Sequence, residues 1–137
     1  MDIFALYTVI AVILYLILGY RVMHLRYRYQ VELGDGGHDE LNRAIRTHAN
    51  FAENVPFLLI IMFLIAQTGP FNAWLHLFGT VMILGRLLHA WGLIRTSGWS
   101  WQRATGTLLT QLLMLAGALF CLWAYMPLAG FLAPLSL

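Results

Sequence analysis

The sequence predicts an all-α integral membrane protein with four transmembrane helices, and two observations support this. Hydrophobic residues make up 61% of the 137-residue chain and charged residues only 10%, whereas soluble domains carry about a quarter charged residues. Four apolar stretches are each close to the roughly 20 residues that cross a bilayer core. We therefore expect one domain over residues 1–137, with spans at about 3–25, 44–67, 73–94 and 105–126.

The first apolar stretch, Ile3 to Tyr20, is predicted to be a retained helix. A cleaved secretory signal begins with a basic segment and ends at a small-residue cleavage site. Here Asp2 precedes the stretch, and no such cleavage site follows it.

The second span is predicted to carry polar residues into the membrane. Its uninterrupted apolar run, from Val55 to Ala66, is 12 residues long, or about 18 Å of helix. A bilayer core is about 30 Å thick, so the helix must also include the preceding turns. Arg46, Asn50 and Glu53 lie there at i, i+4 and i+7, on one helix face. Ionisable groups at membrane depth indicate function by default.

The third span carries Arg86, at a depth matching that of Glu53 on the second. Because a lone charge there is costly, we expect Glu53 and Arg86 to pair, within a chain or across a subunit contact. His89 follows Arg86 by three residues and shares its face. Alternatively, these polar residues with Asn50 only fix helix packing.

The arginines predict the orientation of the chain in the membrane. Every arginine outside a span lies in segments 21–43 or 95–103. The positive-inside rule places both segments in the cytoplasm and both termini in the periplasm. Because these arginines belong to helix ends, we expect no nucleic-acid partner. With Cys121 as the single cysteine and the remaining histidines isolated, we also expect no metal site.

The predicted cytoplasmic mouth of the bundle favours an anionic ligand. Arg43, Arg46 and Arg103 crowd there, and like charges repel unless an anion or carboxylates neutralise them. A ligand with two carboxylates and an amine, such as glutathione, is complementary to this set. Citrate or a lipid headgroup would also fit.

Two motifs resemble those of the membrane-associated proteins in eicosanoid and glutathione metabolism, the MAPEG family. They are Arg46-x-His48-x-Asn50-x-x-Glu53-Asn54-x-Pro56 on the second span and Gly85-Arg86-x-x-His89 on the third. The resemblance implies a left-handed four-helix bundle, a homotrimer, and glutathione as co-substrate bound between subunits near the cytoplasmic face. It implies binding roles for Arg46, His48, Asn50, Glu53, Arg86 and His89, with Arg26 or Arg28 on the glutathione carboxylates. Arg103, at the start of the fourth helix, would stabilise the thiolate as the catalytic residue.

The resemblance implies a glutathione-dependent transferase or peroxidase of a bacterial inner membrane. Its hydrophobic electrophiles or lipid hydroperoxides would arrive from the surrounding lipid. The alternative is a noncatalytic lipid-binding or scaffold member of the same family. Enzymes of the family often carry a tyrosine where this chain has Leu93, and Trp91 is the closest aromatic residue. Arg95 competes with Arg103 for the thiol. A small multidrug exporter is disfavoured because the first span is uncharged.

Overall fold

The computed structural model describes residues 3–126, which form four long helices. They are α1 (Ile3–Tyr29), α2 (Asp39–Gln67), α3 (Asn72–Arg95) and α4 (Trp101–Tyr125). All four are long and apolar enough to cross a membrane. The predicted all-α architecture with four candidate spans is therefore confirmed. Residues 1–2 and 127–137 of the predicted domain lie outside the described residues.

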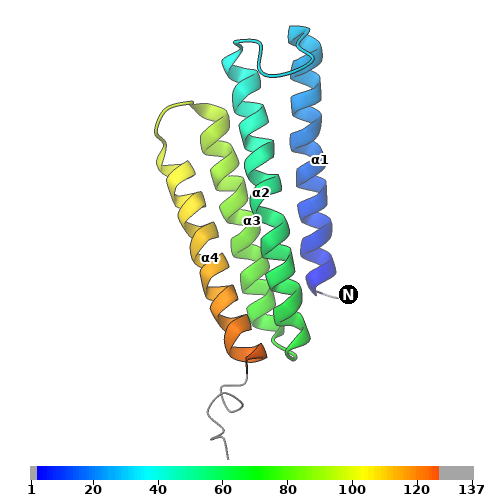
Figure 1. The fold of residues 1–137 in the computed structure, drawn as a ribbon, viewed down its shortest axis with the longest axis vertical. Coiled ribbons are helices and arrows are strands. Elements are labelled where there is room, and N and C mark those ends of the chain that lie inside the picture. The colour runs from blue at the N-terminus through cyan, green and yellow to red at the C-terminus, as the bar shows by residue number, and fades with distance from the viewer. Residues whose placement is uncertain (1–2, 127–137) are drawn as a thin grey trace, which may run out of the picture.

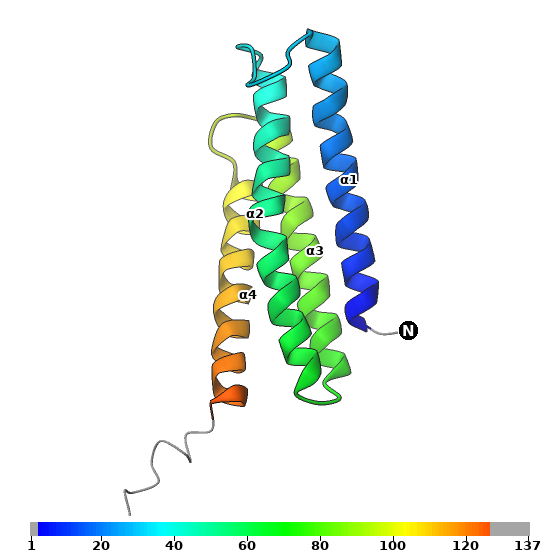
Figure 2. The same cartoon turned by 45° about the vertical axis from the view of Figure 1, so that its right-hand side comes forward.

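The helices stand side by side and alternate in direction (Figures 1 and 2). Helices α2 and α3 occupy the middle, since α1 and α4 each pack against both of them. The connections 30–38 and 96–100 lie at one end, and the connection 68–71 lies at the other. We call the first the arginine-rich end, because it holds Arg26, Arg28, Arg43, Arg95 and Arg103.

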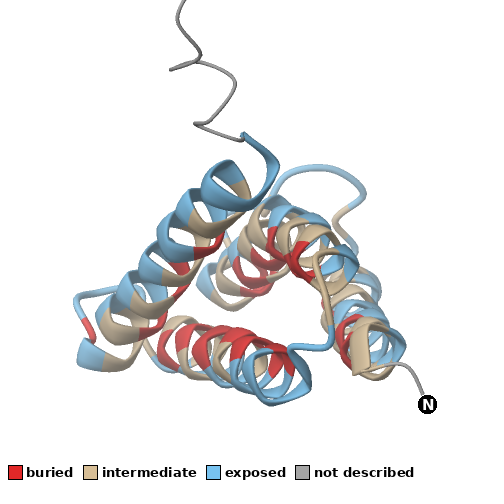
Figure 3. Ribbon diagram, turned by 90° about the horizontal axis from the view of Figure 1, so that it is seen from below, coloured by how far each residue is buried: buried red, intermediate tan, exposed pale blue. Residues whose placement is uncertain are grey.

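Burial is confined to the sides of the helices that face one another (Figure 3). The outward sides carry large exposed apolar residues such as Leu16, Leu84 and Leu119. Lipid is as apolar as such side chains. The outer surface therefore suits a hydrocarbon environment.

Two helix starts determine where arginines project. Helix α2 begins at Asp39, earlier than the span expected from residue 44, with Asp39 and Glu40 in its first turn, where carboxylates are favourable against the helix dipole. Arg43 is thereby helical. Helix α4 begins after Ser100, whose hydroxyl accepts a hydrogen bond from the Arg103 backbone N–H at 3.4 Å. Arg103 thus lies in the first turn of α4.

The core at the opposite end includes Tyr7, Leu58, Met62 and Phe78. The Tyr7 hydroxyl donates to the His76 carbonyl at 3.0 Å and lies 2.8 Å from Thr80 Oγ1. These contacts connect α1 to α3 at the end remote from the arginines.

We expect a Tyr7→Phe substitution to lower the free energy of unfolding by about 1 kcal/mol, because the His76 carbonyl and the Thr80 hydroxyl lose a partner. Unfolding in mixed detergent micelles, followed by circular dichroism, measures the change. The control is Tyr27→Phe, since Tyr27 is 80% exposed. An equal effect at both positions would contradict the structural role given to Tyr7.

Candidate functional site: a cationic pocket between α2, α3 and α4

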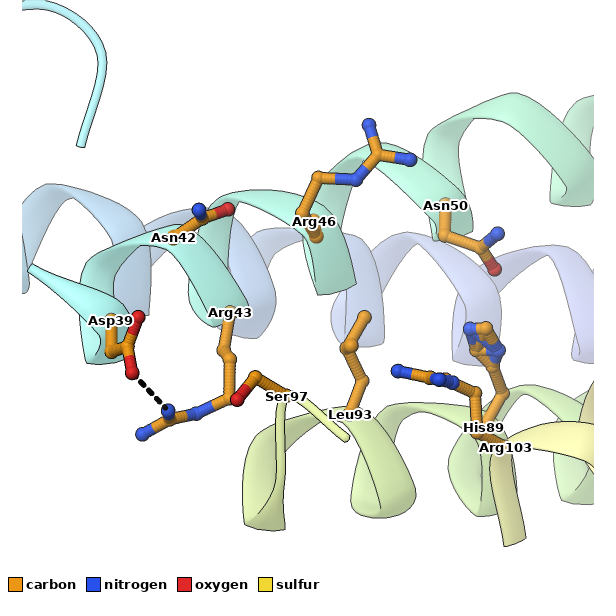
Figure 4. A pocket seen from close by; sticks show the side chains of 9 residues that line it. All are labelled: Asp39, Asn42, Arg43, Arg46, Asn50, His89, Leu93, Ser97 and Arg103. Atoms are coloured by element: carbon orange, nitrogen blue, oxygen red, sulfur yellow. Dashed lines mark ion pairs between the residues drawn. The ribbon is translucent and has the colours of Figure 1, made fainter. Parts of the chain in front are cut away.

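A cavity of about 390 Å³ opens at the arginine-rich end, between α2, the end of α3 and the start of α4. Three arginines and a single carboxylate contribute to its wall, which leaves an excess of positive charge. The lining residues are Asp39, Asn42, Arg43, Arg46, Asn50, His89, Leu93, Ser97 and Arg103 (Figure 4).

Helix α2 supplies one wall of the pocket through a single face. Asp39, Arg43, Arg46 and Asn50 follow one another at spacings of four, three and four residues, which places them in one stripe. Arg43 Nη1 lies 4.0 Å from Asp39 Oδ2, so that carboxylate is shared within the stripe. Within residues 3–126 Arg46 has no ion pair. Its guanidinium is therefore available to an anionic ligand.

Arg86 lies beneath the pocket and joins three helices. Its side chain is buried. Nη1 donates to Asn50 Oδ1 of α2 at 2.6 Å. Nη2 donates to the Gly106 carbonyl of α4 at 2.9 Å and to the Thr110 hydroxyl. Because Arg86 occupies one lone pair of its carbonyl oxygen, Asn50 offers a ligand chiefly its amide N–H groups.

His89 projects from α3 into the same pocket, close to Arg103 in Figure 4. It is 6% exposed. Neither ring nitrogen has a hydrogen-bond partner among the described residues. Buried polar atoms are nearly always hydrogen-bonded, so a polar molecule in the pocket would satisfy this ring.

The predicted pairing of Glu53 with Arg86 within one chain is wrong. Glu53 is exposed on α2, and no ion pair joins the two residues in the described part of the chain. The reason is that Arg86 reaches Asn50, about one turn nearer the arginine-rich end, and α4 supplies its other acceptors. A pairing across subunits stays a prediction.

Three other predicted binding residues lie outside the pocket. The His48 ring packs against Tyr15 of α1, with centroids 4.6 Å apart. Arg26 Nη1 donates to the Glu32 carbonyl at 2.9 Å and so holds the 30–38 connection. Arg28 Nη1 lies 3.9 Å from a Glu40 carboxylate oxygen. The fold therefore gathers Arg46, Asn50, His89 and Arg103, with Arg86 below them.

The sequence left open whether Arg103 or Arg95 faces the site, and the two residues lie in different surroundings in the structure. Arg103 lines the pocket, whereas the Arg95 guanidinium stacks on Trp91, 4.5 Å from the ring centroid. Leu93 also lines the pocket, while Trp91 lies in a separate groove facing α1. The pocket wall is consequently aliphatic where family enzymes often have a tyrosine.

Sequence reasoning missed several residues of the site. Gly106 and Thr110 are the α4 partners of Arg86, and Asn42 and Ser97 line the rim. The available signal was a glycine and a threonine four residues apart within an apolar span, since small and hydroxyl residues mark close helix contacts in membranes.

Four apolar helices with a cationic pocket between them at one end define a multi-pass membrane protein with a polar pocket. Comparison of sequences specifies the class further. The sequence model of the MAPEG family matches residues 4–123. The chain therefore belongs to the MAPEG family.

Two relatives illustrate the similarity. Inner membrane protein YecN of Escherichia coli strain K12 is 36% identical over 123 residues, which cover 90% of this chain and 92% of YecN. A protein of Synechocystis sp. named Uncharacterized protein sll1147 is 32% identical over 130 residues, covering 93% of each chain. The similarity thus extends across all four helices.

Proposed function

We propose that the pocket binds glutathione and that the protein is a glutathione-dependent transferase or peroxidase acting on hydrophobic compounds. The observation that carries this proposal is the convergence of Arg46, Arg103 and the unpartnered His89 on one cavity. Its volume of about 390 Å³ falls within the range of small-molecule sites.

The chemistry of the wall matches the functional groups of glutathione. Guanidinium groups bind carboxylates through paired hydrogen bonds, which suits Arg43 and Arg46. The Asn50 amide donates to a peptide carbonyl of the ligand. Arg103, on the opposite wall, faces the position left for the thiol.

A cationic group beside the thiol supplies the catalytic step. A free thiol with a pKa of about 8.5 is only a few per cent thiolate at neutral pH. The Arg103 guanidinium favours the anion and raises that fraction. The thiolate then attacks an electrophilic carbon, forming the carbon–sulfur bond as the leaving group departs. With a hydroperoxide the thiolate attacks the terminal oxygen, the O–O bond breaks, and the alcohol leaves after taking up a proton. The sulfenic acid formed on glutathione then reacts with a second glutathione, which gives the disulfide and releases water.

Glu53 supports self-association, which we propose gives a trimer. It is the middle residue of α2 (Asp39–Gln67) and is exposed on the single chain. A carboxylate facing hydrocarbon there would be expensive. Contact with a neighbouring subunit would cover it, and could also bring Arg28 or His48 towards a neighbour's pocket.

The location we propose is the bacterial inner membrane, in keeping with the name of the YecN relative. The arginine-rich end, with the pocket, faces the cytoplasm by the positive-inside rule. The chain ends then face the periplasm.

A noncatalytic role in binding lipids or scaffolding is the second candidate, and Leu93 favours it. An aliphatic side chain lines the pocket where family enzymes often have a tyrosine. Such a pocket can bind glutathione without a hydroxyl to assist the thiol.

The two candidates are separated by titrating the purified protein with glutathione and recording both bound ligand and thiolate absorbance in the ultraviolet. We expect wild type to bind glutathione with a thiolate signal, and Arg103→Ala to lose most of that signal, about tenfold. The control is Arg95→Ala, which removes an arginine from the same end but outside the pocket and should retain it.

Three results of this titration would contradict parts of the proposal. Glutathione that binds wild type without any thiolate signal favours the noncatalytic candidate. An equal loss of thiolate in both variants rejects the role of Arg103. Absence of glutathione binding to wild type rejects the proposed ligand.

A further inference from the structure

A second cavity lies on the other side of α3 from the cationic pocket. It has a volume of about 280 Å³, and Leu14, Ile17 and Leu18 of α1 form one wall. Leu87 and Trp91 of α3 form the other. Trp91 and Leu93, two residues apart, face different cavities, so the groove and the pocket are separated by α3 itself.

The polar group nearest this groove has both of its terminal nitrogens occupied, while Arg86 Nε is buried without a hydrogen-bond partner among the described residues. Arg86 contributes to its floor, but its guanidinium is bonded to Asn50, Gly106 and Thr110. The groove therefore offers an apolar surface along its length. The groove differs from other apolar surfaces of the bundle at the arginine-rich end, where arginines follow its walls.

Each wall of the groove leads to an arginine at the arginine-rich end. Arg21 follows Leu18 by three residues and Ile17 by four, which places it on the same face of α1. Arg95 follows Trp91 by four residues and stacks on its ring. Because α1 and α3 run in the same direction (Figure 1), the two arginines continue the two walls towards one end.

These two guanidinium groups are only partly neutralised. Arg21 Nη2 lies 3.8 Å from a Glu40 carboxylate oxygen, and that carboxylate also serves Arg28 at 3.9 Å. No carboxylate pairs with Arg95 in the described segment of the chain. Glu40 is therefore shared by two guanidinium groups and Arg95 has no carboxylate partner among the described residues, so the mouth of the groove retains positive charge.

We propose that this groove is a binding site for an anionic phospholipid. An acyl chain lies along Leu14, Leu18 and Leu87, and the phosphate is held between Arg21 and Arg95. Guanidinium groups bind phosphate through paired hydrogen bonds. Trp91 at the junction is suited to the level of lipid headgroups, where tryptophan is enriched. The charge at the mouth selects an anionic lipid over a zwitterionic one.

The site can be tested through Trp91, which lines the groove. The full chain is reconstituted into two kinds of phosphatidylcholine vesicle. One contains phosphatidylglycerol with brominated acyl chains, and the other contains the same mole fraction of phosphatidylcholine with brominated acyl chains. Bromine quenches nearby tryptophan fluorescence. The contribution of Trp91 is the difference between each protein and the same protein carrying Trp91→Phe.

We expect brominated phosphatidylglycerol to associate with the Trp91 site of wild type about tenfold more strongly than brominated phosphatidylcholine, since each arginine near a membrane surface favours anionic lipid. The double variant Arg21→Gln/Arg95→Gln should lose this preference. The matched double variant Arg26→Gln/Arg28→Gln removes the same charge from the same end and should keep it. A further variant, Ala90→Phe, fills the groove and should abolish quenching of Trp91 by both lipids.

Three results would overturn the proposal. Equal quenching of wild type by the two lipids would show that the groove does not select charge. Loss of preference in both double variants would show only general attraction to the arginine-rich end. Absence of quenching by either lipid would show that the groove is covered by another occupant, such as a second copy of the chain.

Discussion

An Arg86→Leu variant is expected to lose about 3 kcal/mol of free energy of unfolding, since hydrogen bonds from a charged donor and the cost of orphaned buried acceptors are each of this order. The guanidinium supplies donors to Asn50, Gly106 and Thr110. Leucine fills part of the volume but supplies none. Unfolding in mixed detergent micelles, followed by circular dichroism, measures the loss.

The matched control is Arg95→Leu, on the same helix but exposed. Its effect should stay within about 0.5 kcal/mol, as for most surface substitutions. Equal stability of wild type and Arg86→Leu would show that the free-energy cost of burying the guanidinium equals the stabilisation from its hydrogen bonds. The network would then have no net stabilising role.

A Gly106→Ala substitution is expected to destabilise the protein by about 3 kcal/mol, at the upper end of the usual cost of overpacking. A β-carbon at this position would lie 2.6 Å from the Gly85 carbonyl oxygen and 2.7 Å from the His89 backbone nitrogen. Both are backbone atoms of α3 and cannot rotate away. Helix α4 must therefore shift, which also moves Arg103 relative to His89.

Gly85 provides the control because it faces Gly106 across the same contact. A β-carbon on Gly85 would meet its nearest neighbours at 3.6 Å, an ordinary contact distance. Gly85→Ala should therefore be tolerated within about 1 kcal/mol, helped by the better helix propensity of alanine. The same unfolding measurement compares the two, and equal effects would contradict the close approach of α3 and α4 at Gly106.

The helices could be predicted from the sequence because membrane spans depend mainly on length and apolar content. The polar face of α2 followed from spacing, since Arg46 and Asn50 at i and i+4 must share a side of any helix. The predicted second span began at residue 44, whereas α2 itself begins at Asp39. A hydropathy argument marks the hydrocarbon core and does not detect the helical turn that extends beyond it.

The partner of Arg86 could not be predicted for a physical reason. Matching depth favoured Glu53, but depth does not fix the rotation of α2 about its axis. That rotation directs Asn50 towards α3 and leaves Glu53 outside. Acceptance by the Gly106 carbonyl further requires two backbones in close contact, which residue spacing within one helix cannot reveal.

The Arg86 network has a consequence for motion within the bundle. Its hydrogen bonds connect α2, α3 and α4 but include no atom of α1. Helix α1 is attached separately, through Tyr7 at one end, through Ala11 against Phe51 and Val55 in the middle, and through Leu25 against Leu41 at the other end. Local openings start where the fewest interactions must break. Separation of α1 from the other helices would therefore leave the hydrogen bonds of Arg86 unbroken, since they join only α2, α3 and α4.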